Sequence, residues 1–224
     1  MRWLRRPRTD QAALPTLPLQ PVSRVFGADR GRPIDRWYIE RFLAKHAADV
    51  RGRVLEVAES TYTGWYGGNT VTSSDVLYAT PANPDATIVG DLTNSAGLPQ
   101  AAFDCFICTQ TLQFIYDVRA AVAGTRALLA PGGVLLATLP GISQISREDM
   151  RDWGDWWRFT TRSAERLFSE IYPPENIEVE RHGNVAAAAA FLYGLAAEEL
   201  DTGQLDASDP DFHFLITVRA VAPA

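Results

Sequence analysis

Residues 53–75, RVLEVAESTYTGWYGGNTVTSSD, have the pattern of a buried strand, a ligand loop and a second strand. The apolar, β-branched segment 53–57 predicts a central strand, and it contains Glu56 just before a loop rich in Ser, Thr and Gly. A second strand over residues 70–74 ends in Asp75. Because ligands of open parallel sheets bind over the carboxyl ends of the strands, the two acids predict a crevice that binds hydroxyl or amino groups.

Length and composition indicate an ordinary globular chain. It has 224 residues, of which 46% are hydrophobic and 21% charged. We expect a flexible basic, proline-rich tail over residues 1–22 and a single domain over residues 23–224. A net charge of −6 argues against a nucleic-acid partner. Prolines interrupt residues 9–22, so no signal peptide or membrane span is expected, and we predict a cytoplasmic protein with no membrane partner.

The two cysteines, Cys105 and Cys108, lie in the apolar segment FDCFICTQ. This segment predicts a buried strand, on which residues three apart point to opposite faces. We therefore expect two small core residues, neither a redox pair nor a metal site.

An arginine-rich loop, residues 24–32, precedes a helix that Pro33 favours at its start. Asp35 complements the positive end of that helix, and apolar residues recur on one face. The loop either closes over an anion such as a carboxylate or is a solvated surface loop. Arg30, Arg36 and Tyr38 are the candidate donors for such a carboxylate.

The spacing of the next strands is unusually short. About a dozen residues separate Ala58 from the second strand, and ten lie between Asp75 and a third strand over residues 86–89. A parallel crossover needs a dozen or more residues including its helix. We therefore expect an α/β sheet whose first crossover helix is cut to about a turn and whose second is missing. Further strands are expected at 103–109, 134–139, 176–180 and 214–220, and further helices at 117–129, 160–171 and 185–200.

The order of these segments resembles class I S-adenosylmethionine-dependent methyltransferases over residues 33–220. The resemblance is carried by VLEVAES, SSDVL, VGDLTN, FDCFICTQTLQFIYD and LLAPGGVLLATLPG, and WWRFTTRSAERLF is similar to a segment of small-molecule and glycan-cluster members. It implies a Rossmann-like, seven-stranded, mostly parallel sheet with the last strand antiparallel. It also implies S-adenosylmethionine as cofactor and S-adenosylhomocysteine as product.

The resemblance assigns roles to the acids at the strand ends. It implies that Glu56 lies near the methionine amino group and that Asp75 accepts both ribose hydroxyls. Asp91 would lie near the adenine amino group, with Leu92 against the ring. For each acid the alternative is a solvated charge at a strand end or a helix start.

Other positions are implied to contact the cofactor as well. Gln110 and Thr111, after the fourth strand, would face the methionine and the transferred methyl. Ala58, Ser60 and Val76 complete the set.

One departure from the family pattern affects the first loop. The family has acid-x-Gly-x-Gly-x-Gly, where glycine lets the backbone approach the cofactor. This chain has Ala58, Ser60 and Tyr62 at those positions. Cofactor binding is therefore expected to be weakened, rearranged or lost.

Candidate catalytic residues follow from the chemistry of methyl transfer to oxygen, which a general base assists. His182, after the sixth strand, and Asp117, after the fourth, are the candidates. The alternatives are a solvated turn histidine and a helix cap. Trp153, Trp156 and Trp157 either form a lid over the acceptor or pack in the core.

Two functions remain open from the sequence. The first is methyl transfer to oxygen or nitrogen of a small molecule, such as a sugar, a glycan precursor or a secondary metabolite. The second is a methyltransferase-like protein that has lost this activity and serves as a binding or scaffold partner, or catalyses another reaction. The alanine-rich segment 186–190 packs against its own sheet or in a homodimer.

Overall fold

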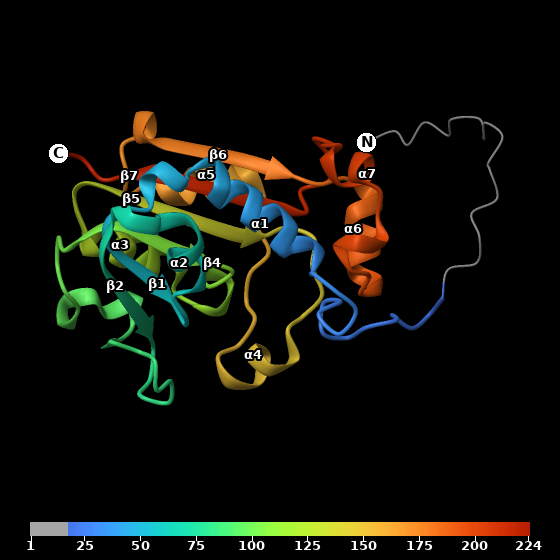
Figure 1. Cartoon of the computed structure of the whole chain (residues 1–224), viewed down its shortest axis with the longest axis horizontal. Coiled ribbons are helices and arrows are strands. Elements are labelled where there is room, and N and C mark those ends of the chain that lie inside the picture. The colour runs from blue at the N-terminus through green and yellow to red at the C-terminus, as the bar shows by residue number, and fades with distance from the viewer. Residues whose placement is uncertain (1–17) are drawn as a thin grey trace, which may run out of the picture.

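The computed structural model describes residues 18–224, and these form one seven-stranded sheet (Figure 1). The strand order is β3-β2-β1-β4-β5-β7-β6, and only β7 runs antiparallel to its neighbours. This confirms the predicted fold class. The strands are β1 (Gly52–Val57), β2 (Val71–Tyr78), β3 (Ile88–Val89), β4 (Phe103–Thr109), β5 (Leu129–Pro140), β6 (Ile177–His182) and β7 (Leu215–Val221).

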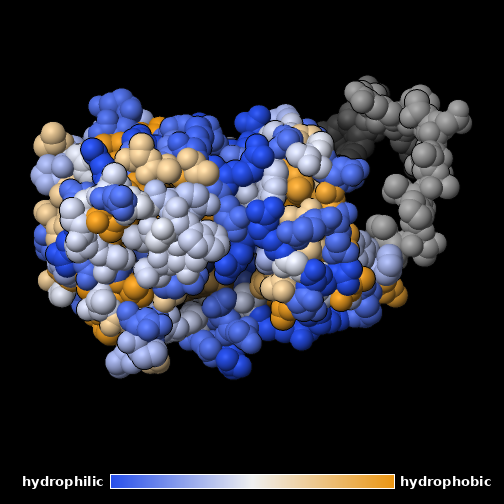
Figure 2. Space-filling model, viewed as in Figure 1, coloured by the Kyte–Doolittle hydropathy of each residue, from blue (hydrophilic) through white to orange (hydrophobic). Residues whose placement is uncertain are grey.

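Helices cover both faces of the sheet, which gives three layers. One face is covered by α1 (Ile34–Lys45), α2 (Thr61–Gly67) and α6 (Val185–Tyr193), and in Figure 1 α1 and α2 lie in front of the strands. The other face is covered by α3 (Val118–Leu128) and α5 (Thr161–Ser169). Two short helices, α4 (Arg147–Asp152) and α7 (Thr202–Asp206), complete the set. The outer surface in Figure 2 is mainly hydrophilic, with apolar side chains scattered over it.

The central strands β4 and β5 carry apolar side chains on both faces, as strands between two helical layers must. Cys105 and Cys108 show this directly. Cys105 packs with the α1 side of the core and Cys108 with the α3 side, and both are free and buried. The prediction that they are core residues on opposite faces is confirmed.

The crossovers after β1 and β2 are reduced, as the spacing predicts. The seven residues of α2 make about two turns, and within the described chain no helix joins β2 to β3. Residues 79–87 instead form an extended loop. The first two crossovers therefore leave much of the sheet's carboxyl edge without a helix beside it.

The predicted end of the second strand is wrong. β2 does not stop at residue 74 but continues to Tyr78, so Asp75 lies inside the strand. The acid is tolerated there because Arg53 and the Thr87 hydroxyl hydrogen-bond to its carboxylate. At about 3.3 Å per residue, Asp75 lies about 10 Å short of the strand's carboxyl end.

Two further bounds differ from the expectation. The fifth strand starts at Leu129, five residues earlier than predicted, because Leu129 pairs with Phe103 before an irregularity in the register. The alanine-rich helix ends at Tyr193, where Gly194 takes φ 75° and closes the helix. The predicted tail falls mostly on residues 1–17, which lie outside the described residues.

The close approach of α3 to the segment after β3 gives a test of this packing. A Cβ on Gly124 would lie 2.0 Å from the Leu92 carbonyl oxygen, so Gly124→Ala forces the two segments apart. We expect a loss of about 1–3 kcal/mol in the free energy of unfolding, measured by urea denaturation. Gly203→Ala in α7 is the control, because a Cβ there meets open space and is expected to be neutral or stabilising.

Candidate functional site

The chain reverses its direction of travel across the sheet between β1 and β4. β1 leads to β2 on one side, while β4 leads to β5 on the other, and β1 and β4 are neighbours. Ligands of open α/β sheets bind outside the carboxyl ends of the strands at such a switch point. The candidate site is therefore the edge formed by the residues that follow β1, β2, β3 and β4.

Two non-glycine residues with left-handed backbone flank this switch point. Ala58, directly after β1, has φ 70°, and Gln110, directly after β4, has φ 46°. A side chain in this region costs on the order of 1–3 kcal/mol and persists only where the surroundings impose it. Two of the four non-glycine residues with positive φ in the described chain thus lie at the edge where a ligand is expected; the other two are Phe26 and Ala101.

Ala58 takes a left-handed conformation that glycine adopts without strain. Its amide donates to Leu77 O at 3.0 Å, and its carbonyl accepts from Asn83 Nδ2 at 2.7 Å. These two hydrogen bonds hold the backbone in this conformation in spite of the Cβ. Ser60 follows as the residue at the N-terminal end of α2.

Glu56 is buried beneath the start of α2. Its two carboxylate oxygens accept hydrogen bonds from Tyr62 N (3.2 Å), Thr63 N (2.8 Å) and Thr63 Oγ1 (2.8 Å). Burial raises the pKa of Glu56, and these hydrogen bonds oppose that rise. The carboxylate thus anchors the loop between β1 and α2; a contact with a methionine amino group stays a prediction.

The end of β2 is occupied by Tyr78, not by an acid. Asp75 is paired with Arg53 Nε at 2.8 Å, and Val76 is buried in the strand. The Tyr78 ring packs edge to face against Trp153, with ring centroids 5.8 Å apart. The strand end therefore presents neither Asp75, which was predicted to bind the ribose, nor Val76, which was predicted to contact the cofactor.

Asp91 and Leu92 follow β3 as expected. Asp91 is exposed and caps a short 3-10 helix through Thr93 N at 2.8 Å. Leu92 is buried against α3. Of the acids predicted for the cofactor, Asp91 is the one that lies exposed beyond the end of its strand.

The residues after β4 are bound to one another. Gln113 Nε2 donates to the Gln110 carbonyl (2.9 Å) and to Gln110 Oε1 (3.1 Å), while Thr111 Oγ1 donates to Thr109 O at 2.9 Å. Because the backbone carbonyl only accepts, the orientation of the Gln113 amide is fixed. Gln113 Oε1 is buried and has no hydrogen-bond partner.

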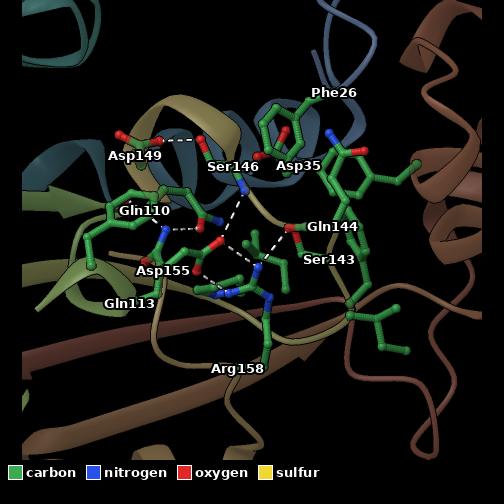
Figure 3. A pocket seen from close by; sticks show the side chains of 16 residues that line it. Phe26, Asp35, Gln110, Gln113, Ser143, Gln144, Ser146, Asp149, Asp155 and Arg158 are labelled. Atoms are coloured by element: carbon green, nitrogen blue, oxygen red, sulfur yellow. Dashed lines mark hydrogen bonds and ion pairs between the residues drawn. The ribbon is translucent and has the colours of Figure 1, made fainter. Parts of the chain in front are cut away.

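A cavity of about 170 Å³ lies beside Gln110, next to the switch point (Figure 3). Its polar wall comes from the start of α1, the segment after β4 and the segment after β5. The polar residues that line it are Asp35, Gln110, Gln113, Ser143, Gln144, Ser146, Asp149, Asp155 and Arg158. Apolar lining includes Phe26 and Phe214.

Asp155 and Arg158 fix one wall of this cavity. Arg158 Nη2 donates to Asp155 Oδ2 at 2.8 Å and to Gln144 O at 2.7 Å, and Ser146 N donates to Asp155 Oδ2 at 3.0 Å. Burial works to raise the pKa of Asp155, but the hydrogen bonds from Arg158 and Ser146 N hold that pKa below its ordinary value. The segment 144–158 is thereby folded back on itself as a rigid loop.

Asp35 lines the same cavity and forms no ion pair within the described chain. Its Oδ1 accepts from Arg36 N at 2.9 Å. Burial raises the pKa of Asp35 to about 6, against the hydrogen bond from Arg36 N. In the sequence, Asp35 is interpreted as a charge at the start of a helix. The surrounding residues, Pro33-Ile34-Asp35, do not indicate that it lines a cavity.

Of the three residues proposed to hold a carboxylate, two are already bound to other groups of the protein. Arg30 pairs with Glu199, with Nε to Oε2 at 2.9 Å. Tyr38 is buried and its hydroxyl donates to Leu205 O at 2.7 Å. Arg36 is exposed at the start of α1, beside Asp35. Arg36 is therefore the one of the three whose charge and exposure fit the proposed role.

The two candidate bases lie outside the lining of the cavity. His182 Nε2 hydrogen-bonds to Thr217 Oγ1 at 2.9 Å, and its ring lies 5.9 Å from that of Tyr38. Burial lowers the pKa of His182. Asp117 caps α3 through Ala120 N at 3.1 Å, which is the alternative the sequence left open.

The tryptophans of the expected lid lie around the loop 144–158. Trp153 reaches Tyr78, and Trp157 Nε1 donates to Ile115 O at 3.1 Å. Trp156 is half exposed and packs against Tyr116. The aromatic side chains thus cover the segments next to the cavity and are not core residues.

Known proteins show the same domain and fold. Residues 50–137 match the family model described as a methyltransferase domain, and no curated protein matches the sequence. Residues 50–137 thus match a methyltransferase domain, and the fold around them is one that S-adenosylmethionine-dependent methyltransferases share. Phosphoethanolamine N-methyltransferase 2 of Haemonchus contortus, solved with phosphomonomethylethanolamine and S-adenosylhomocysteine, is 14% identical with a TM-score of 0.56 over 84% of this chain and 53% of that one.

Two other structures show the methyltransferase fold over nearly their whole length. NodS, an N-methyltransferase of Bradyrhizobium japonicum, is 14% identical with a TM-score of 0.52 over 87% of this chain and 90% of NodS. A chain in the Haloferax volcanii complex of the activator Trm112 with a putative methyltransferase is 16% identical with a TM-score of 0.52, over 91% and 100%. The chain spans about half the length of the Haemonchus proteins.

Two other classes of feature are absent from the part of the chain that the structure describes. Residues 18–224 contain no group of three His, Cys, Asp or Glu side chains placed to hold a metal ion. No helix in the same range is long and apolar enough to cross a membrane.

The strain at Ala58 predicts that Ala58→Gly stabilises the methyltransferase domain. Glycine takes φ 70° without the steric cost of a Cβ, so we expect a gain of about 1 kcal/mol in the free energy of unfolding. Ala189→Gly on the exposed side of α6 is the control, where the same change is expected to cost about 1 kcal/mol. Equal losses for both variants in chemical denaturation would contradict the assignment.

The raised pKa of Asp35 predicts a pH-dependent cost to stability. A carboxylate whose folded pKa is raised to about 6 destabilises the native state above that pH and has no such effect below its unfolded value. Asp35→Asn is therefore expected to raise the free energy of unfolding by about 1–3 kcal/mol at pH 8. The gain should shrink as the pH falls through 6 towards 4 in denaturation curves. A gain that is the same at both ends of this range would show that the charge is not its cause.

Proposed function

We propose that this chain transfers the methyl group of S-adenosylmethionine to oxygen or nitrogen of a small molecule such as a sugar, a glycan precursor or a secondary metabolite. The observation that carries the proposal is the pair of left-handed residues, Ala58 and Gln110, on either side of the switch point. Such strain marks functional edges. Ala58 also takes a left-handed conformation that glycine adopts without strain.

The residues at the sheet edge fit the cofactor in part. Ala58 and Ser60 would lie against it after β1, Asp91 with Leu92 would hold the adenine, and Gln110 with Thr111 would face the methionine. Glu56 supports this edge from below through its bonds to the start of α2. Asp75 does not fit the ribose role, since Arg53 and Thr87 occupy it. Tyr78, at the end of β2, takes its place beside the ribose.

Methyl transfer requires the acceptor atom to approach in line with the breaking bond, so the main task of the protein is to position the two reactants. When bound, S-adenosylmethionine supplies a methyl group on a sulfonium sulfur. The cavity beside Gln110 would hold the acceptor, and the loop 144–158 would keep water from it. Asp35 is better placed than His182 or Asp117 to accept a proton, because it lines that cavity.

The experiment is thermal unfolding with and without S-adenosylhomocysteine at about a hundred times its dissociation constant. Mass action then predicts about 2.7 kcal/mol of stabilisation, or about 5–10 °C for a chain of this size. We expect Asp91→Asn to reduce the shift. Asp104→Asn is the matched control, because Asp104 also accepts a backbone hydrogen bond, from Arg53 N at 2.8 Å, but lies at the amino end of β4.

The absence of any shift would favour the other function that the sequence left open, a methyltransferase-like protein that binds a partner or catalyses another reaction. The missing glycines and the paired Asp75 are the features that point that way. A shift that Asp91→Asn and Asp104→Asn reduce equally would place the ligand somewhere other than the carboxyl edge.

A further inference from the structure

The cavity beside Gln110 offers a ligand acceptors but few donors. Arg158 donates to Asp155, to Gln144 O and to Trp157 O at 2.8 Å. The hydroxyl of Ser146 donates to Asp149 Oδ2 at 2.5 Å, and that of Ser143 to Gln144 O at 3.0 Å. The donors that line the cavity from this loop are thus already engaged within the protein.

Two of the three amide donors of the wall are engaged in the same way. Gln113 Nε2 is held by Gln110, and Gln144 Nε2 donates to Arg24 O at 3.2 Å. What remains for a ligand are one amide donor, Gln110 Nε2, and several oxygens. Gln113 Oε1 is buried without a partner, in a residue that is 4% exposed. A buried acceptor left without a donor costs about 1–3 kcal/mol, which a ligand donor would recover.

The net charge of the cavity lining also favours a ligand that donates hydrogen bonds and carries positive charge. Three carboxylates line it, on Asp35, Asp149 and Asp155, against one cation, Arg158, which is paired with Asp155. Figure 3 shows Asp155 between Ser146 and Arg158, with Asp35 beside Phe26. The lining therefore carries an excess of negative charge, and among the described residues no Arg, Lys or His forms an ion pair with Asp35, although Arg36 follows it in the chain.

We propose that this cavity binds the acceptor as an amine, with the nitrogen donating to Asp35 and Gln113 Oε1, so that methyl transfer occurs at nitrogen. This rests on the proposed function and selects one of its two acceptor atoms. A protonated amine brings up to three donors and one positive charge, which matches a wall of free acceptors with excess negative charge. A neutral hydroxyl matches the acceptors but leaves the charge of Asp35 uncompensated.

Methyl transfer to a bound amine balances with Asp35 as the proton acceptor. The bound ammonium gives one proton to the Asp35 carboxylate, which frees the nitrogen lone pair. The nitrogen–carbon bond forms as the carbon–sulfur bond breaks, and the bonding electron pair stays on sulfur. The positive charge thereby passes from sulfur to the methylated nitrogen, and Asp35 releases its proton to water. A pKa of about 6 brings Asp35 closer to this exchange than an ordinary aspartate.

The test is calorimetric titration with a matched pair of single-ring probes, glucosamine and glucose, which differ by an amine in place of one hydroxyl. The titrations are done with the protein saturated with S-adenosylhomocysteine and with the protein alone. Both forms are used because the lining of the cavity consists of residues of this chain, so the amine can bind without the cofactor. We expect glucosamine to bind at least about tenfold more tightly, since a charge-assisted hydrogen bond contributes about 1.5–3 kcal/mol. Asp35→Asn should abolish the preference.

The control variant is Glu165→Gln in α5, which removes the same charge outside the cavity. It is expected to keep the preference. In the unmodified protein the preference should also fall as the pH falls through about 6. The other charges near Asp35 are Arg36 and Glu40 on α1, with Asp149, Asp155 and Arg158 across the cavity.

Equal binding of the two probes, or a preference that survives in Asp35→Asn, would overturn the assignment of an amine. So would the absence of binding by either probe to both forms of the protein. These results leave the thermal shift with S-adenosylhomocysteine intact, so failure of the amine site is distinguished from failure of the methyltransferase function. A preference seen in the protein alone, without any thermal shift, would support the amine site and contradict the cofactor site.

Discussion

The buried Glu56 carboxylate determines how the chain leaves β1. Burying it is costly, and the cost is offset by bonds from Tyr62 N, Thr63 N and Thr63 Oγ1 at the start of α2. These bonds hold the start of α2 against β1, although only residues 58–60 separate the end of the strand from the helix. The chain between them has to turn sharply, and Ala58 adopts φ 70° to do so. The strained backbone at the carboxyl edge is thus a consequence of satisfying one buried charge.

Short crossovers then decide which segments build the rest of the site. Because residues 79–87 form no helix, the N-terminal side of the sheet contributes little wall beyond Tyr78 and the 3-10 helix that Asp91 caps. The missing wall comes from the other side, where the loop 144–158 folds back and sends Trp153 across to Tyr78. A fold with reduced early helices therefore has its cavity between the start of α1 and the segment after β5.

The sequence predicted the sheet well because strands such as β4 are apolar runs with clear ends, and β4 has the predicted bounds. It predicted the site less well. Asp75 was placed at a strand end because an acid usually stops a buried run, but its partner Arg53 lies on the neighbouring strand and cannot be seen in a linear pattern. Asp35 and Gln113 were missed for a related reason. Their role depends on a cavity formed with residues 143–158, more than a hundred positions from Asp35.

The acceptors that line the cavity also affect where a positive charge is stabilised during methyl transfer. Methyl transfer from a sulfonium moves a positive charge from sulfur to the acceptor and does not create one, so a negative wall helps the reaction only if it lies nearer the acceptor than the sulfur. Asp35 and Gln113 line the cavity, while Asp91 and Ser60 lie along the edge. The cavity has three carboxylates, Asp35, Asp149 and Asp155, against one cation, Arg158. On the proposed function, a positive charge that passes to an acceptor bound there would be stabilised by this wall.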